Sequence, residues 1–130
     1  APPPKPSLPP APTADVAAMY AAVQAAGKKD DRELAVQPLR DPQVEDLREL
    51  AASALSRGDL TAAADALNQA LLIVADDPAI LQERAEVALL ATDLTRAETL
   101  SQRAIDLGSA AGPLCRRHWE TLRQVRESLQ

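Results

Sequence analysis

The residues best suited to chemistry are the single cysteine and the single histidine, Cys115 and His118. They stand three positions apart in the stretch LCRRH, so on a helix they share one face. A metal site needs further ligands, and the sequence has no other histidine or cysteine to supply them. Nucleophilic catalysis needs the pair in hydrogen-bond contact, with an orienting group and an oxyanion site. Cys115 aligns with the core positions Leu47 and Leu81, so we interpret it as an inert buried thiol.

Neighbouring carboxylates are the other candidates for acid–base chemistry. They occur in three pairs: Asp30 and Asp31, Asp76 and Asp77, and Glu83 and Glu86. Each pair is equally explained as solvated surface, or as negative charge at a helix start, where the helix dipole favours it. The four glycines form no phosphate-binding loop. The sequence therefore predicts no enzyme, no cofactor and no metal.

Composition favours helices as the elements that hold these residues. Hydrophobic residues make up 46% of the 130 positions but aromatic residues only 2%, and the apolar residues are mostly alanine and leucine. Alanine and leucine are strong helix formers, whereas strands prefer β-branched and aromatic residues. We expect an all-α fold.

Charge and hydropathy exclude several classes of protein. Residues 41–107 carry thirteen acidic and five basic side chains, and such an acidic body argues against nucleic acid as a partner. No apolar run approaches the roughly 20 residues that a membrane-spanning helix needs. A single cysteine permits no disulfide within the chain.

Proline divides the chain into three parts. The first twelve residues, APPPKPSLPPAP, hold seven of the eleven prolines, so residues 1–13 are predicted to be a disordered, extended tether. A spacer of required length and a docking peptide for a proline-binding module are the alternatives. Residues 14–40 are predicted to be a short helix, capped by Thr13 and stopped by Gly27, followed by a linker with a possible turn at 31–36. Residues 41–130 form the main domain.

Helix-start signals recur at a regular spacing in the main domain. Asp41-Pro42, Asp77-Pro78 and Gly112-Pro113 each place a capping residue before a proline at the first helical position. The tripeptide DLT occurs at 59–61 and again at 93–95, where its aspartate is a second start signal. These signals predict five helices, at about 42–57, 60–75, 78–91, 94–107 and 113–129. Helix pairs repeated at this period bury their apolar faces by stacking.

The period and the placement of small residues resemble the tetratricopeptide repeat (TPR) family. The matching positions in the first repeat are Leu47, Leu50, Ala51, Ala54, Gly58, Ala63, Leu67 and Ala70. Those in the second are Leu81, Ala85, Ala88, Ala97 and Ala104. Arg84, Thr92 and Ser101 depart from the pattern. The resemblance covers residues 44–107 and implies about two and a half TPR-like repeats, with 113–129 as a C-terminal capping helix.

The resemblance also implies a concave face, formed by the first helix of each pair, that binds a protein partner. The residues expected on it are Glu45, Arg48, Ser56, Gln82, Glu86, Leu89, Arg116, Glu120 and Arg123. With so few repeats, the helix near 14–26 is expected to pack on an end of the stack, or the protein to dimerise. Trp119 falls where earlier repeats have alanine, and we interpret its ring as filling space left at the last helix.

A narrower resemblance rests on LQERAEVALL, RAIDLG and GPLCRRHWETL. These stretches are similar to LpoP-type lipoproteins, outer-membrane activators of a bifunctional peptidoglycan synthase. The resemblance implies a periplasmic location, a class A penicillin-binding protein as partner, and a lipid anchor on a cysteine that would precede Ala1. It implies that the domain acts without catalysis. A generic TPR adaptor in complex assembly or secretion, and an accessory domain of an enzyme, are the alternatives.

Overall fold

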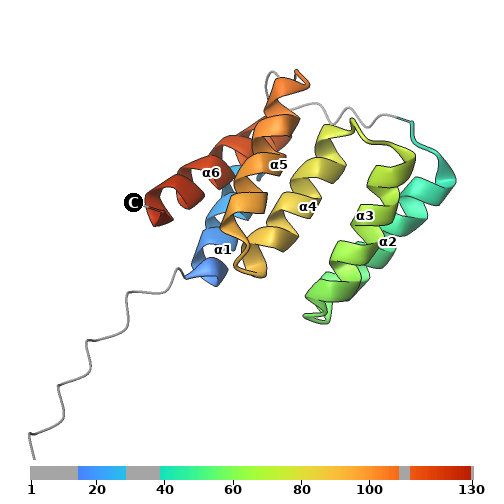
Figure 1. Cartoon of the computed structure of the whole chain (residues 1–130), viewed down its shortest axis with the longest axis horizontal. Helices are drawn as coiled ribbons and strands as arrows, with labels where there is room; N and C mark the ends of the chain where they lie inside the picture. The colour runs from blue at the N-terminus through green and yellow to red at the C-terminus, as the bar shows by residue number, and fades with distance from the viewer. Residues whose placement is uncertain (1–14, 29–38, 109–111, 130) are drawn as a thin grey trace, which may run out of the picture.

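A computed structural model describes residues 15–28, 39–108 and 112–129. In these ranges the chain forms helices and no strand, which confirms the all-α prediction (Figure 1). The helices are α1 (Val16–Ala26), α2 (Pro42–Ser56), α3 (Leu60–Ile73), α4 (Pro78–Leu90), α5 (Leu94–Asp106) and α6 (Pro113–Ser128). The predicted tether at 1–13 and the predicted turn at 31–36 lie outside the described residues.

Aspartate side chains fix most of the helix starts. The Asp77 carboxylate accepts a hydrogen bond from the Ala79 N–H at 3.0 Å, and Asp41, Asp59 and Asp93 cap their helices in the same way. Such a cap contributes about 1 kcal/mol because it satisfies an amide that has no partner inside the helix. The prediction that Thr13 caps the first helix is wrong. The cap is Asp15, whose carboxylate accepts from the Ala18 N–H at 3.0 Å.

Two antiparallel helix pairs and a final single helix form a TPR-like stack, as the repeat pattern predicted. α2 pairs with α3 and α4 pairs with α5, while α3 packs against α4 and α5 against α6 (Figure 1). Small side chains bring the paired helices close together. Ala51 and Ala54 of α2 belong to one buried cluster with Ala63 and Leu67 of α3.

Helix α1 packs on α4 and α6, the first helices of the second and third repeats. Met19 and Val23 of α1 are buried in a cluster with Leu89 of α4 and Val125 of α6. The sequence predicted that this helix would pack on an end of the stack. Instead it covers part of the face that the sequence assigned to the partner-binding groove.

Gly27, predicted as a helix stop, is required for close packing. Its φ of −87° is open to any residue. A Cβ atom at this position would lie 2.3 Å from Cδ of Arg117 on α6, so a larger residue would force the Arg117 side chain to move. The glycine therefore lets the end of α1 touch α6.

A buried polar network joins α4, α5 and α6 through the amide of Gln82, which is fully buried. The amide oxygen accepts from Ser101 Oγ at 3.0 Å and from His118 Nδ1 at 2.8 Å. The amide nitrogen donates to Thr121 Oγ1 at 2.9 Å and to Glu86 Oε2 at 2.7 Å. All four hydrogen-bonding positions of the amide are used, so the buried Gln82 side chain has no polar atom without a partner.

The network explains one departure from the repeat pattern, and a second buried contact explains another. Ser101 stands where the TPR pattern has a large apolar residue, because its hydroxyl reaches the Gln82 amide. Arg84 stands where leucine is usual. Its side chain crosses to α3 and donates from Nε to Asn68 Oδ1 at 2.8 Å. Burial lowers the pKa of Arg84.

The turn between α4 and α5 carries backbone strain at Thr92. Its φ of 67° lies in the left-handed region, and it is the one non-glycine residue with positive φ in the described ranges. Gly58, at φ 73°, takes the same conformation in the turn between α2 and α3. We expect Thr92→Gly to stabilise the fold by about 1 kcal/mol, because a β-branched residue pays a steric cost there. Gly58→Ala is the reciprocal control and should destabilise by a similar amount in urea unfolding. Equal stabilities of Thr92→Gly and wild type would contradict the conclusion that the backbone is strained at Thr92.

His118 makes the fold sensitive to acid. Its ring is fully buried, burial and then the charge of Arg117 lower its pKa to about 4, and its Nε2 has no hydrogen-bond partner. Because the unfolded state binds the proton more readily, stability is retained above pH 6.5 and falls as the pH drops from 6.5 to 4. The loss should reach up to about 3 kcal/mol. In His118→Gln this part of the pH dependence should disappear when unfolding is measured at pH 7, 5.5 and 4.5. An unchanged slope in the variant would show that another group titrates.

Candidate protein-interaction surface

The structure divides the nine residues predicted on the concave face into three groups. Three of them, Gln82, Glu86 and Leu89, are buried in the core and are not accessible to a partner in this structure. Glu45, Arg48 and Ser56 lie on α2, and Arg116, Glu120 and Arg123 lie on α6. The predicted groove is therefore not one continuous surface.

Helix α1 and an internal ion pair account for the buried group. Gln24 of α1 donates a hydrogen bond to Glu86, and Arg117 of α6 donates to the same carboxylate at 2.7 and 2.8 Å. Glu86 keeps only 3% of its surface exposed, so its charge is compensated inside the fold by Arg117. Burial of the Tyr20 side chain on α1, and then the negative charge of Glu86, raise the pKa of Tyr20. This part of the TPR-like face is occupied by the chain itself.

A small cleft remains between α1 and α2, with a volume of about 160 Å³. Its apolar floor comes from α2, α3 and α4, and its rim from charged and polar side chains. The lining residues are Tyr20, Gln24, Arg48, Ala51, Ala52, Leu55, Leu67, Glu83, Glu86, Val87 and Arg117. The volume suits one side chain rather than a small-molecule ligand, since such ligands occupy roughly 300 Å³ or more.

Ion pairs between α2 and α4 close this cleft on one side. Arg48 binds Glu83 through both Nε and Nη2 and binds Glu45 at 3.0 Å. The Arg48–Glu83 hydrogen bond is the largest cause of the raised pKa of Arg48. Ser56, by contrast, only donates to the Ser53 carbonyl of its own helix at 2.7 Å. The predicted α2 residues Glu45, Arg48 and Ser56 are thus engaged in contacts within the chain.

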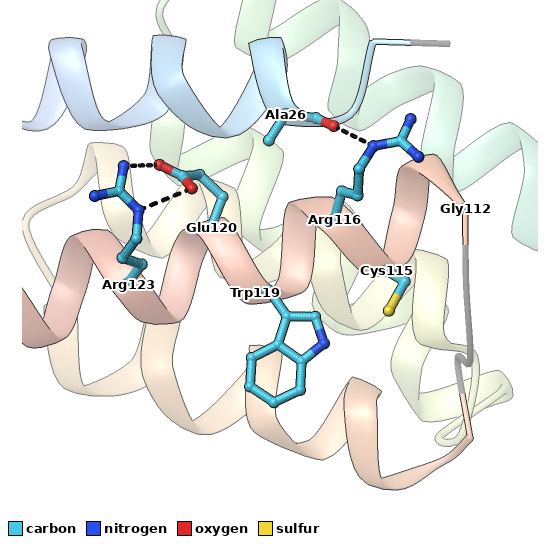
Figure 2. Close-up of a pocket in the computed structure, with 7 residues that line it drawn as sticks. All are labelled: Ala26, Gly112, Cys115, Arg116, Trp119, Glu120 and Arg123. Atoms are coloured by element: carbon cyan, nitrogen blue, oxygen red, sulfur yellow. Dashed lines mark hydrogen bonds and ion pairs between the residues drawn. The ribbon is translucent and has the colours of Figure 1, made fainter. Parts of the chain in front are cut away.

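The three α6 residues come together around an open depression of about 500 Å³ (Figure 2). It is lined by Ala26, Gly112, Cys115, Arg116, Trp119, Glu120 and Arg123. Arg116 donates from Nε to the Ala26 carbonyl at 2.8 Å and from Nη2 to the Lys28 carbonyl at 3.1 Å. Arg123 donates to Glu120 and Glu127, and its bond to Glu120 lowers the pKa of that carboxyl. We call this area the α6 face.

Trp119 is the prominent apolar side chain of the α6 face. Figure 2 shows its indole extending from α6 on the side opposite to α1. The side chain is 53% exposed, whereas Ala51 and Ala85, at the same position of the earlier repeats, are buried. The sequence interpretation of Trp119 as a filler of the end space is therefore incomplete, because about half of the residue stays in solvent. Its exposure was not visible in the sequence.

The described residues hold no recognisable catalytic or metal centre. No group of three or more His, Cys, Asp or Glu side chains in these ranges is placed to hold a metal ion. Cys115 is a buried free thiol, and His118 is bound to Gln82 with its pKa lowered by burial. None of the helices in the described part of the chain is long and apolar enough to cross a membrane.

Comparisons with known proteins give one informative similarity. No protein-family model matches the chain, and a search of curated proteins gives no match. Among solved structures, the chain is similar to the globular C-terminal domain of LpoP from P. aeruginosa, with a TM-score of 0.65 and 28% sequence identity. The match covers 70% of this chain and 86% of the LpoP domain. The chain is thus a TPR-like helical domain with the LpoP globular domain as a structural neighbour, as the LpoP-type sequence resemblance predicted.

Proposed function

We propose that this chain is a non-enzymatic activator of a bifunctional peptidoglycan synthase, a class A penicillin-binding protein. The observation that carries the proposal is the structural similarity to the LpoP globular domain over most of that domain's length. The stretch GPLCRRHWETL, which carries the LpoP-type resemblance, forms most of α6 and the α6 face.

The proposed mechanism requires only binding. A domain that binds the active conformation of an enzyme more tightly than the resting one shifts the equilibrium toward activity. A TPR-like stack presents a preformed surface, so little conformational entropy is lost on contact. The proline-rich segment at 1–13 would act as a tether, and a lipid anchor preceding Ala1 would hold the domain at the outer membrane facing the periplasm.

A generic adaptor is the alternative function. TPR-like stacks are scaffolds that serve many partners, so the fold alone does not select the synthase. The occupied groove counts against the usual adaptor mode, in which a peptide lies along the first helices. In this chain α1, through Met19 and Val23, and the buried Glu86 take that space.

The test is a binding and rate measurement with the whole chain. We expect immobilised chain to retain a class A synthase from detergent-solubilised envelope, and the purified synthase to polymerise glycan about fivefold faster with the chain present. A monofunctional glycosyltransferase serves as the control and should not respond. A truncation that removes residues 1–14 should keep both activities, since it retains α1. Retention of other envelope proteins without any synthase would favour the adaptor.

A further inference from the structure

We propose that the α6 face is the partner-docking surface, and that it receives an amphipathic helix of the partner whose apolar stripe covers Trp119 and whose edges carry carboxylates. This inference rests on the proposed function, because it names the contact surface for the same partner. The argument combines repeat geometry, exposure and charge.

Repeat geometry predicts a helix as the occupant. In the first two repeats, α3 packs on α2 and α5 packs on α4. Ala51 and Ala85, on the covered faces of α2 and α4, are 4% and 0% exposed. Trp119 holds the same position on α6, and the described residues include no helix that pairs with α6 as α3 pairs with α2 and α5 with α4. A partner helix at this place would complete the third pair by the packing that holds the other two.

The side chain at this position favours an interface over simple solvation. The outer face of a terminal repeat helix is normally polar. Here it carries the only tryptophan of the chain, 53% exposed and next to the depression that Cys115 and Gly112 also line. Tryptophan is the residue type most enriched among interface residues that dominate binding energy, because it buries a large rigid surface.

Charge selects the chemistry of the partner helix. α6 carries four arginines and two glutamates, while the whole chain has fourteen basic and nineteen acidic residues. Arg123 stands one helical turn from Trp119, and its side chain is 55% exposed. Its pair with Glu127 joins two exposed side chains and therefore contributes little, whereas the Glu120 carboxylate is 17% exposed. A partner carboxylate can therefore compete for the Arg123 guanidinium.

Two other depressions in the described residues suit a partner helix less well. One of about 430 Å³, between α1 and the C-terminal end of α6, is lined by Asp15, Ala18, Met19, Gln124, Glu127 and Ser128, so it offers no aromatic anchor. The cleft between α1 and α2 has room for one side chain, and its mouth is bridged by the Arg48–Glu83 pair. Leu72 on α3 is 86% exposed, but it does not line any depression of the size of the α6 face. Leu72 is therefore a suitable matched control for Trp119.

The experiment measures the affinity of full-length variants for the purified synthase and the stimulation of glycan polymerisation. We expect Trp119→Ala to weaken binding about 30-fold, as for a dominant interface residue, and Arg123→Glu about tenfold. Leu72→Ala should stay within about twofold of wild type. Circular dichroism and thermal unfolding should show the fold retained in all three variants, since the substituted side chains are about half or more exposed.

A photo-crosslinking amino acid at position 119 gives a second reading that does not depend on loss of binding. It should capture a helical segment of the synthase containing Asp or Glu, while the same probe at position 72 should capture none.

Three outcomes would contradict one of the two proposals. If wild type binds and stimulates but Trp119→Ala and Arg123→Glu bind as well as wild type, the docking surface is elsewhere and only this inference fails. If wild type itself neither binds nor stimulates, the proposed function fails first. A wild-type dimer in light scattering that Trp119→Ala makes monomeric would assign the α6 face to a second copy and overturn the inference.

Discussion

The arrangement of the helices depends on the polar side chains buried along α4. Gln82 connects α4 to α5 through Ser101 and to α6 through His118, while Glu86 connects the same helix to α1. Each buried hydrogen bond of this kind adds only modest net stability, but a buried polar group left without a partner is costly. Such bonds therefore favour one arrangement of the alanine-rich helices over alternative packings in which these groups would be unpaired. Alanine and leucine supply most of the apolar burial in this small stack, and the Gln82 and Glu86 contacts join α4 to α5, α6 and α1.

The same contacts fill the groove that a TPR-like stack usually leaves open. In a stack with an open groove, the first helices present their side chains to a peptide. Here the pair of Glu86 with Arg117 and the packing of Val23 on Leu89 turn that face into core. Removing α1 would uncover Leu89 and Val125 and take the Gln24 hydrogen bond from Glu86, so α1 is an integral part of the fold. The proposed partner contact therefore lies outside the groove.

Local signals in the sequence defined most of the fold. The Asp-Pro, Gly-Pro and DLT signals placed five helices to within about two residues, because helix-start signals are local features of the sequence. The burial of Gln82 and the position of α1 depend on contacts between residues more than thirty positions apart, which periodicity cannot report. Arg84 and Ser101 looked like defects in the repeat and proved to be parts of buried contacts. For the candidate site, the sequence placed Arg116, Glu120 and Arg123 on the concave face. In the structure they line one depression with Trp119, which the sequence interpretation treated as a filler of end space.

The packing of α1 and the shape of the α6 face are linked through Arg116. Its guanidinium donates to the Ala26 and Lys28 carbonyls at the C-terminal end of α1, where the helix dipole favours a positive charge. Because Gly27 lets that end approach α6 closely, the rim of the depression is built partly from α1 and held by these bonds. A rim fixed before binding reduces the entropy lost on contact, and Trp119 has few rotatable bonds of its own to order. The helix that fills the groove is therefore the helix that organises the surface beside it.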